Sequence, residues 1–188
     1  DFIDFIGIDF PIFKGADLRE ANLNGINFQK VDFSGSNLSG AVLRKANLKR
    51  ANLSGATLQK ADLRGANFAE ANLSKTDLRQ ANLAQAEFNG TNLHLAKLQE
   101  TNIEGAIFRS AELLETNFEA SNLAGSRFEE TVIENTNLSR ANLTSVDFRN
   151  KVLTATNFYG SVLKKADLSD LNLSGKEMCH TDLSGANL

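Results

Sequence analysis

Apolar side chains recur along this chain with a period of five residues. From Ala16 the sequence reads ADLRE, ANLNG, INFQK, VDFSG, SNLSG and keeps this register to Leu188. We number the positions of each repeat one to five, so that the third-position residues run from Leu18 to Leu188. All 35 of these are Leu, Phe, Ile or Met, 29 of the 35 first-position residues are Ala, Ser or Thr, and 24 second-position residues are Asn or Asp. The chain is therefore one uninterrupted repeat array.

Neither an α-helix nor a flat β-strand accommodates this period. Apolar residues spaced by five walk around a 3.6-residue helical turn and build no single stripe. In a pleated strand, an odd period sends successive third-position residues to opposite faces. The pattern instead predicts a backbone that turns once per repeat, with the first and third side chains inside and the other three outside.

The phenylalanines indicate how many repeats close one coil. Nine third-position residues are Phe, and six of these share one phase of a 20-residue period: Phe28, Phe68, Phe88, Phe108, Phe128 and Phe148. This phase is expected if four repeats form a coil with a square cross-section. We predict that the rings of five of them stack between coils: Phe68, Phe88, Phe108, Phe128 and Phe148.

These repeats resemble the A(D/N)LXX motif of the pentapeptide-repeat family, particularly its Ala-Asn-Leu-rich cyanobacterial members, over essentially the whole chain. The resemblance implies an all-β fold, a right-handed quadrilateral parallel β-helix. At the ~4.8 Å spacing of β-strands it would have about nine coils and a length on the order of 40 Å. Each buried Leu or Phe would contribute roughly 1.5–3 kcal/mol to its stability.

The array divides at one change of register. Residues 16–188 form the continuous β-helix, whereas residues 1–15 contain repeats centred on Phe5 and Phe10, three residues out of register with Leu18. The segment from Pro11 to Gly15 is then either a short corner or loop, or part of a hydrophobic end that binds a partner.

Three first-position residues depart from the small-residue rule near the C-terminus. Lys151 and Lys176 are expected to bulge outward, because a buried ammonium group is costly. Leu171 is too large for its position. These departures predict a looser C-terminal end. The last residue, Leu188, leaves this end without a cap, so we expect either a further C-terminal segment or pairing with another chain.

Net charge, apolar stretches and cysteine content give limited information about function. The net charge of −3 does not favour direct nucleic-acid binding, and no stretch is long and apolar enough to predict membrane insertion. Cys179 is the only cysteine, so no intrachain disulfide can form. A chain without an intrachain disulfide fits the reducing cytoplasm. Because the sequence begins with Asp1 instead of Met, removal of a presequence and location in the periplasm or thylakoid lumen are also compatible with it.

No constellation of residues predicts catalysis, a cofactor or a metal site. His94 and His180 are far apart in the array, and Cys179 beside His180 lacks metal-ligand spacing. Most glycines occupy the fifth position, where a turn requires them. We therefore expect a protein that is not an enzyme.

Charges cluster in two bands along the predicted rod. Residues 44–64 have a local balance of +5 and residues 100–134 a balance of −6. Either these bands are a mixed, solvated surface, or the acidic band belongs to a binding site. Apolar residues at the coil period would form a vertical stripe beside three of its carboxylates. The candidate partner-binding surface comprises Leu95, Glu112, Leu114, Glu115, Val132, Glu134 and Val152.

The sequence therefore favours a non-catalytic scaffold or regulatory module that binds a protein partner, with a homodimer or end-to-end association as further options. Two alternatives stay open. Some members of the family mimic DNA and protect DNA gyrase, which requires an extended acidic surface that the basic band would interrupt. The chain would otherwise be the repeat portion of a larger protein.

Overall fold

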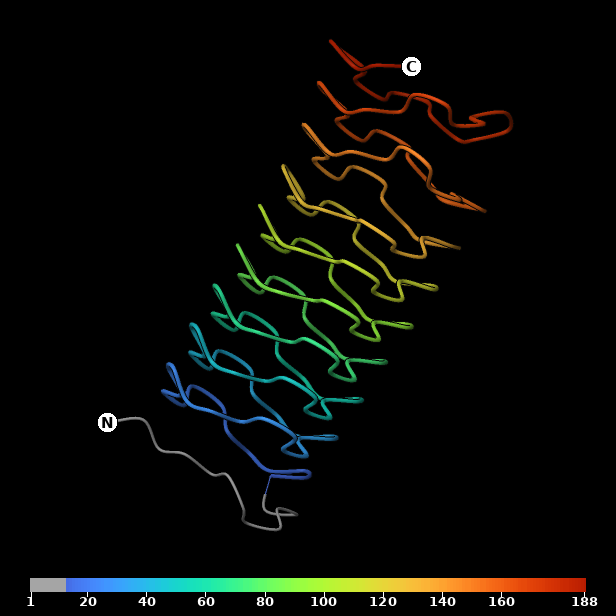
Figure 1. The fold of residues 1–188 in the computed structure, drawn as a ribbon. Helices are drawn as coiled ribbons and strands as arrows, with labels where there is room; N and C mark the ends of the chain where they lie inside the picture. The colour runs from blue at the N-terminus through green and yellow to red at the C-terminus, as the bar shows by residue number, and fades with distance from the viewer. Residues whose placement is uncertain (1–12) are drawn as a thin grey trace.

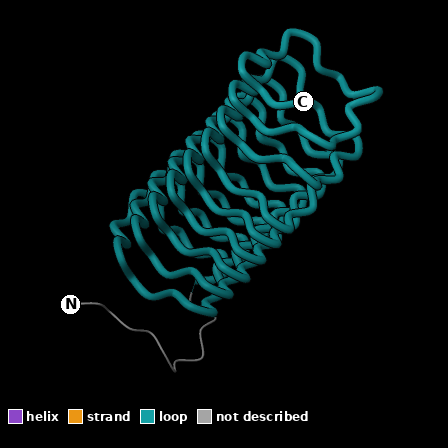
Figure 2. Tube along the Cα trace, turned by 45° about the horizontal axis from the view of Figure 1, so that its top comes forward, coloured by secondary structure: helices purple, strands orange, loops and turns teal. Residues whose placement is uncertain are grey.

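The computed structural model describes residues 13–188, which form one elongated stack of coils (Figure 1). This part of the chain contains no helix and no extended strand, as Figure 2 shows. Its β structure consists of isolated parallel bridges between second-position residues 20 apart, such as Asp17 and Asn37. Such a stack of bridged repeats is a β-solenoid.

The bridges run along the stack as four ladders. We number them in chain order: the first contains Asp17 and Asn37, the second Asn22 and Val42, the third Asn27 and Asn47, and the fourth Asp32 and Asn52. Residues separated by 20, or by a multiple of 20, therefore belong to the same column. A turn joins each ladder to the next.

Backbone hydrogen bonds hold neighbouring coils together. The Leu18 N–H donates to the Asn37 carbonyl at 2.7 Å, and the Asn37 N–H donates back to the Ala16 carbonyl at 2.9 Å. The Ala21 N–H closes the turn on the Leu18 carbonyl at 3.2 Å. The same bonds recur through most of the stack, so most backbone groups find partners although no extended strand forms.

The fifth residue of every described repeat from Gly15 to Gly185 has a positive φ angle, between 48° and 70°. An i to i+3 hydrogen bond with positive φ at the third turn residue is the pattern of a type II turn. Glycine adopts this conformation without steric cost. The turn therefore explains why most glycines lie at the fifth position.

The interior is built from the first and third positions. Five Phe rings stack in one column, with centroids 5.1 Å apart for Phe68 and Phe88, 4.8 Å for Phe88 and Phe108, 5.0 Å for Phe108 and Phe128, and 5.9 Å for Phe128 and Phe148. Most first-position Thr hydroxyls donate to third-position carbonyls 23 residues earlier, as Thr91 does to Phe68 at 2.7 Å. Most small polar side chains are thus satisfied inside the stack, and the buried Ser161 hydroxyl is an exception.

Asn and Asp at the second position stabilise the outside of each turn. The Asn37 Oδ1 accepts the Ser39 N–H at 3.1 Å, and the Asn47 Nδ2 donates to the Asn27 Oδ1 one coil earlier at 3.0 Å. One short side chain therefore fixes its own turn and joins adjacent coils, which accounts for its frequency at this position.

The described structure begins at Phe13, 20 residues before Phe33. The two rings contact each other with centroids 5.1 Å apart, and the Gly15 N–H donates to the Ser34 carbonyl at 2.9 Å. Phe13 therefore occupies a third position beneath Phe33. The predicted repeats at Phe5 and Phe10 lie outside the described residues.

Candidate partner-binding surface

The four apolar residues of the candidate surface lie on or beside the fourth ladder. Val132 and Val152 share its column and are 49% and 66% exposed. Leu114 and Leu95 are partly buried and occupy the turn that follows this ladder. Because Leu95, Leu114 and Val132 take the fifth, fourth and second positions of successive coils, they form a diagonal band. The predicted vertical stripe is wrong in this respect, since only residues 20 apart share a column.

Three carboxylates lie among these apolar residues without a counter-ion. Glu112 is bridged to Val132, Glu115 is exposed in the turn, and Glu134 is partly buried. None has an ion pair or a side-chain hydrogen bond with another described residue. Other glutamates of the acidic band do have partners: Arg109–Glu130 at 3.1 Å, Arg127–Glu129 at 2.8 Å and Arg140–Glu119 at 3.6 Å. We name the seven residues Leu95, Glu112, Leu114, Glu115, Val132, Glu134 and Val152 the acidic–apolar patch.

In the basic band, in contrast, four of the six cations have an ion pair with a carboxylate. Arg64 and Arg44 contact the Asp62 carboxylate at 2.8 and 2.7 Å. Hydrogen bonds from Arg64, then from Arg44, lower the pKa of Asp62 from 3.8 to about 2, against the opposing effect of partial burial. The carboxylate thus stays charged and holds both guanidinium groups.

Glu70 neutralises a further part of this band. It lies 20 residues after Arg50 and contacts Arg50 at 2.6 Å and Lys49 at 3.2 Å. In the described chain, Lys45 and Lys60 are the cations of the band without an ion pair. Glu70 lies outside residues 44–64 but in the column of Arg50, so including it reduces the local balance from +5 to +4.

Beside the acidic–apolar patch, two neighbouring coils separate. In the described chain no bridge joins Arg127 to Asp147 or Val132 to Val152. The Phe128 N–H therefore lacks the bond to Asp147 that the regular pattern would supply, although Phe128 is only 2% exposed. A cleft of about 420 Å³ opens here, lined by Gly125, Ser126, Arg127, Phe128, Glu129, Glu130, Ser145, Asp147, Arg149, Asn150 and Lys151.

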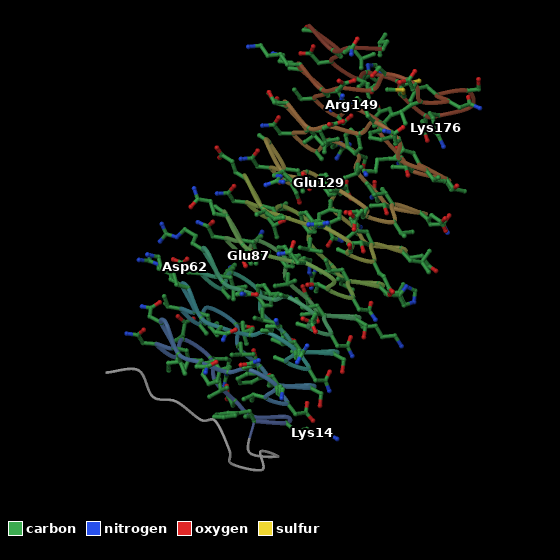
Figure 3. The ribbon with its side chains drawn as sticks, in the orientation of Figure 1. Lys14, Asp62, Glu87, Glu129, Arg149 and Lys176 are labelled. Carbon is green, nitrogen blue, oxygen red and sulfur yellow. The ribbon has the colours of Figure 1, made fainter. Side chains whose placement is uncertain are left out.

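Lys151 explains this separation. It occupies a first position that Ala, Ser or Thr fills in most other repeats, it is partly buried, and its side chain lines the cleft. Its positive charge acts on the carboxylates of Glu129, Glu130 and Asp147. Figure 3 shows Glu129 and Arg149 on neighbouring coils at this level. A long side chain in a small interior position thus keeps the two coils apart.

Comparison with known proteins bears on this architecture. A profile of pentapeptide repeats matches residues 12–50, 46–83 and 77–113, and a profile of a pentapeptide repeat region matches residues 106–178. The chain belongs to the pentapeptide-repeat family. No curated protein matches it.

Two solved structures illustrate how similar this pentapeptide-repeat chain is to others. HetL, described as involved in heterocyst differentiation regulation in the cyanobacterium Nostoc sp. strain PCC 7120, is 24% identical, with 94% of this chain and 88% of HetL covered and a TM-score of 0.58. A trypsin-treated form of QnrB1, described as a plasmid-mediated fluoroquinolone resistance protein, is 23% identical, with 93% and 84% covered and a TM-score of 0.59. At these identities the likeness concerns the fold.

The three pentapeptide repeats with Lys or Leu at the first position lack bridges, whereas those with Ile or Val there have them. The repeats without bridges begin at Lys151, Leu171 and Lys176. Leu171 is partly buried against the core. The Lys176 ammonium does not bulge outward as predicted, because it donates to the Leu153 carbonyl, 23 residues earlier, as a first-position Thr would. Lys151 is also partly buried, and its charge acts on the outer carboxylates of the cleft.

The described residues hold no group of three or more His, Cys, Asp or Glu side chains that could bind a metal ion. His94 Nδ1 lies 3.1 Å from the Leu114 carbonyl, and the His180 ring meets the Tyr159 ring edge-on at 5.4 Å. Cys179 is exposed. These side chains make structural contacts and do not converge. Among the described residues, no helix is long and apolar enough to span a membrane.

Two features escaped the sequence analysis. One is the cleft, for which Lys151 in a first position was the available signal. The other is the turn after the fourth ladder in the three coils that precede the patch. It carries Ser34, Gly35, Ser54, Gly55, Ser74 and Lys75. Aligning the sequence in rows of 20 residues would have placed this turn next to the patch.

Proposed function

We propose that this pentapeptide-repeat protein is a non-catalytic scaffold or regulatory module that binds a protein partner through the acidic–apolar patch. We also infer the finer architecture of the family, a right-handed quadrilateral rod of about nine coils, which would hold this surface rigidly. A rigid surface loses little conformational entropy on binding.

One observation carries the proposal. Glu112, Glu115 and Glu134 lack counter-ions in the described chain, whereas several neighbouring glutamates are paired with Arg. Val132 and Val152 lie beside them and are 49% and 66% exposed. Unpaired charge next to exposed apolar surface is typical of a binding site, because a partner can supply both counter-ions and apolar contact.

The test is affinity capture from the native cell with the whole chain and with Glu112→Lys/Glu115→Lys. We expect the double variant to lose a protein that the wild type retains. The matched control is Glu100→Lys/Glu104→Lys, which changes the charge equally. Glu100, like Glu115, is a fifth-position residue with positive φ. Equal recovery with both double variants would reject the patch as the binding site.

The gyrase-protecting alternative receives less support from the charges. Arg109, Arg127 and Arg140 interrupt the acidic band as partners of its glutamates, so it is not a continuous acidic surface. We expect the protein neither to inhibit gyrase supercoiling nor to protect gyrase from a quinolone. Inhibition or protection in that assay would restore this alternative.

A further inference from the structure

The turn after the fourth ladder changes character along the stack. In the first three coils it carries small side chains apart from Lys75, in the next three it carries mostly large ones, and in the last two it carries small ones again. The small members are Ser34, Gly35, Ser54, Gly55 and Ser74, and the large ones are His94, Leu95, Leu114, Glu115 and Glu134. The large side chains are therefore confined to the three coils from His94 to Glu134, with small side chains on either side of them.

The fifth-position column of this turn has a charge pattern that complements itself. Lys75, Leu95 and Glu115 follow one another in three successive coils. Lys75 and Glu115 are exposed, and neither has an ion pair with another described residue. If a second copy of the column is placed antiparallel to the first, with the two Leu95 residues facing each other, Lys75 of each copy lies opposite Glu115 of the other.

We propose that a second copy of this chain docks antiparallel along the fourth ladder, with the two-fold axis at Leu95. Lys75 of each copy then pairs with Glu115 of the other, and the two Leu95 side chains meet at the axis. Such an interface uses the same surface on both copies, as two-fold dimers do. The inference rests on the proposed function, since it uses the acidic–apolar patch and names its occupant.

Shape supports this arrangement on both sides of the axis. Two coils from Leu95, the Glu134 side chain of one copy would face Ser54 and Gly55 of the other. A Cβ atom added at Gly55 would meet nothing within 4 Å, so the space above this turn is open. Leu114 would likewise face Ser74. Large side chains thus meet small ones on both sides of the central Leu95 and Lys75–Glu115 contacts.

The available area is sufficient for a dimer. The described chain exposes 9050 Å², shared among the sides that carry the four ladders. One side with its turns therefore has on the order of 2,000 Å², and a standard interface buries about 800 Å² per partner. Two exposed ion pairs and a small apolar centre predict a weak dimer that salt dissociates.

The experiment measures the mass of the whole chain by sedimentation velocity across a concentration series at low and high salt. We expect a shift from the monomer mass of 20.4 kDa toward twice that value, reversed by salt. Lys75→Glu and Glu115→Lys should each weaken association roughly tenfold or more, because each places like charges opposite one another at two symmetric points. The double variant Lys75→Glu/Glu115→Lys should restore it.

An equimolar mixture of the two single variants gives the sharpest result. Each is repelled by its own copy, but one carries Glu at both positions and the other carries Lys at both, so the mixture should form a heterodimer. Lys60→Glu is the matched control, since Lys60 is an exposed fifth-position residue in the turn between the first and second ladders. It should associate like the wild type. Circular dichroism of every variant checks that the fold is retained.

Three results would overturn the proposal: a monomer at every concentration, a dimer that both single variants leave unchanged, or a double variant that does not recover. A monomer that still loses its cellular partner on Glu112→Lys/Glu115→Lys would reject self-association and leave the proposed function standing. If the protein dimerises as proposed but all patch variants retain the same cellular proteins, self-association would stand and the proposed function would be rejected.

Discussion

The early coils and the coils around Lys151 are built from the same repeat, yet only the early ones stack without interruption. From Asp17 to Asn122, every second-position residue is bridged to the residue 20 positions later. From Arg127 onward, bridges are missing at four positions, all next to repeats with Lys or Leu at the first position. The size of one interior side chain therefore decides locally whether two coils close. Because each repeat contacts only its neighbours, the defect does not spread through the stack.

The largest effect is expected in the regular part of the Phe stack. Phe108→Ala should lower the free energy of unfolding by about 3–5 kcal/mol, since its buried ring contacts Phe88 and Phe128 at 4.8 and 5.0 Å. Phe148→Ala should cost less, because its separation from Phe128 is already 5.9 Å. Urea denaturation of both variants makes the comparison. Equal losses would show that the opening does not loosen the core.

Closing the cleft beside Lys151 should stabilise the protein. Lys151→Thr should raise the free energy of unfolding by about 1–2 kcal/mol, because the coils can re-form backbone hydrogen bonds. The Thr hydroxyl would also reach the Phe128 carbonyl, as Thr131 reaches Phe108. Hydrogen exchange should show greater protection of the Phe128 and Ile133 amides. Lys164→Thr, a change at an exposed outer position, should leave both amides unaffected. Unchanged protection in Lys151→Thr would mean that another residue holds the coils apart.

Acid should weaken the two regions to different extents. The pKa of Asp62 is lowered from 3.8 to about 2, so its contribution is fully present above pH 4 and is lost as pH falls toward 2. Asp62→Asn should therefore cost about 1 kcal/mol at neutral pH and nothing below pH 2. Arg149 lowers the pKa of Asp147 in the opened region, but both side chains are more than half exposed. Asp147→Asn should cost less. Thermal melts of both variants from pH 2 to 7 provide the measurement.

The smallest effect concerns one turn column present in both regions. Gly55 and Ala155 are both fifth-position residues in the turn after the fourth ladder, with φ angles of 65° and 49°. Gly55→Ala should destabilise by about 1 kcal/mol through backbone strain alone, since the added Cβ meets no atom within 4 Å. Ala155→Gly should stabilise by about 0.5 kcal/mol or more. If both changes destabilise, backbone strain does not dominate at this position.

Much of the fold is readable from the repeat because its causes are local. A five-residue period of large and small apolar residues can be buried only if the chain turns once per repeat. Asn or Asp before each large residue satisfies the turn that follows it, as Asn37 does for Ser39. Even Lys151, Leu171 and Lys176 could be recognised as departures, since each violates a size rule that the other repeats define.

The candidate site was less predictable because charge pairing depends on the stacking of coils. The sequence alone placed Glu112, Glu115 and Glu134 near apolar residues, but their lack of counter-ions became visible only when Arg109, Arg127 and Arg140 were found paired with other glutamates. The diagonal course of the apolar band became visible only once residues 20 apart were placed in one column. The same is true of the turn with Ser54, Gly55 and Ser74 next to Lys75.

The sequence by itself thus determined the repeat, the inward and outward positions and the places where the pattern fails, because burial of apolar side chains follows a short period along the chain. The tertiary structure alone decided which charges neutralise each other, as Arg50 and Glu70 do across 20 residues, and where Lys176 places its ammonium. Those outcomes depend on side chains from neighbouring coils, whose contacts exist only once the coils are stacked.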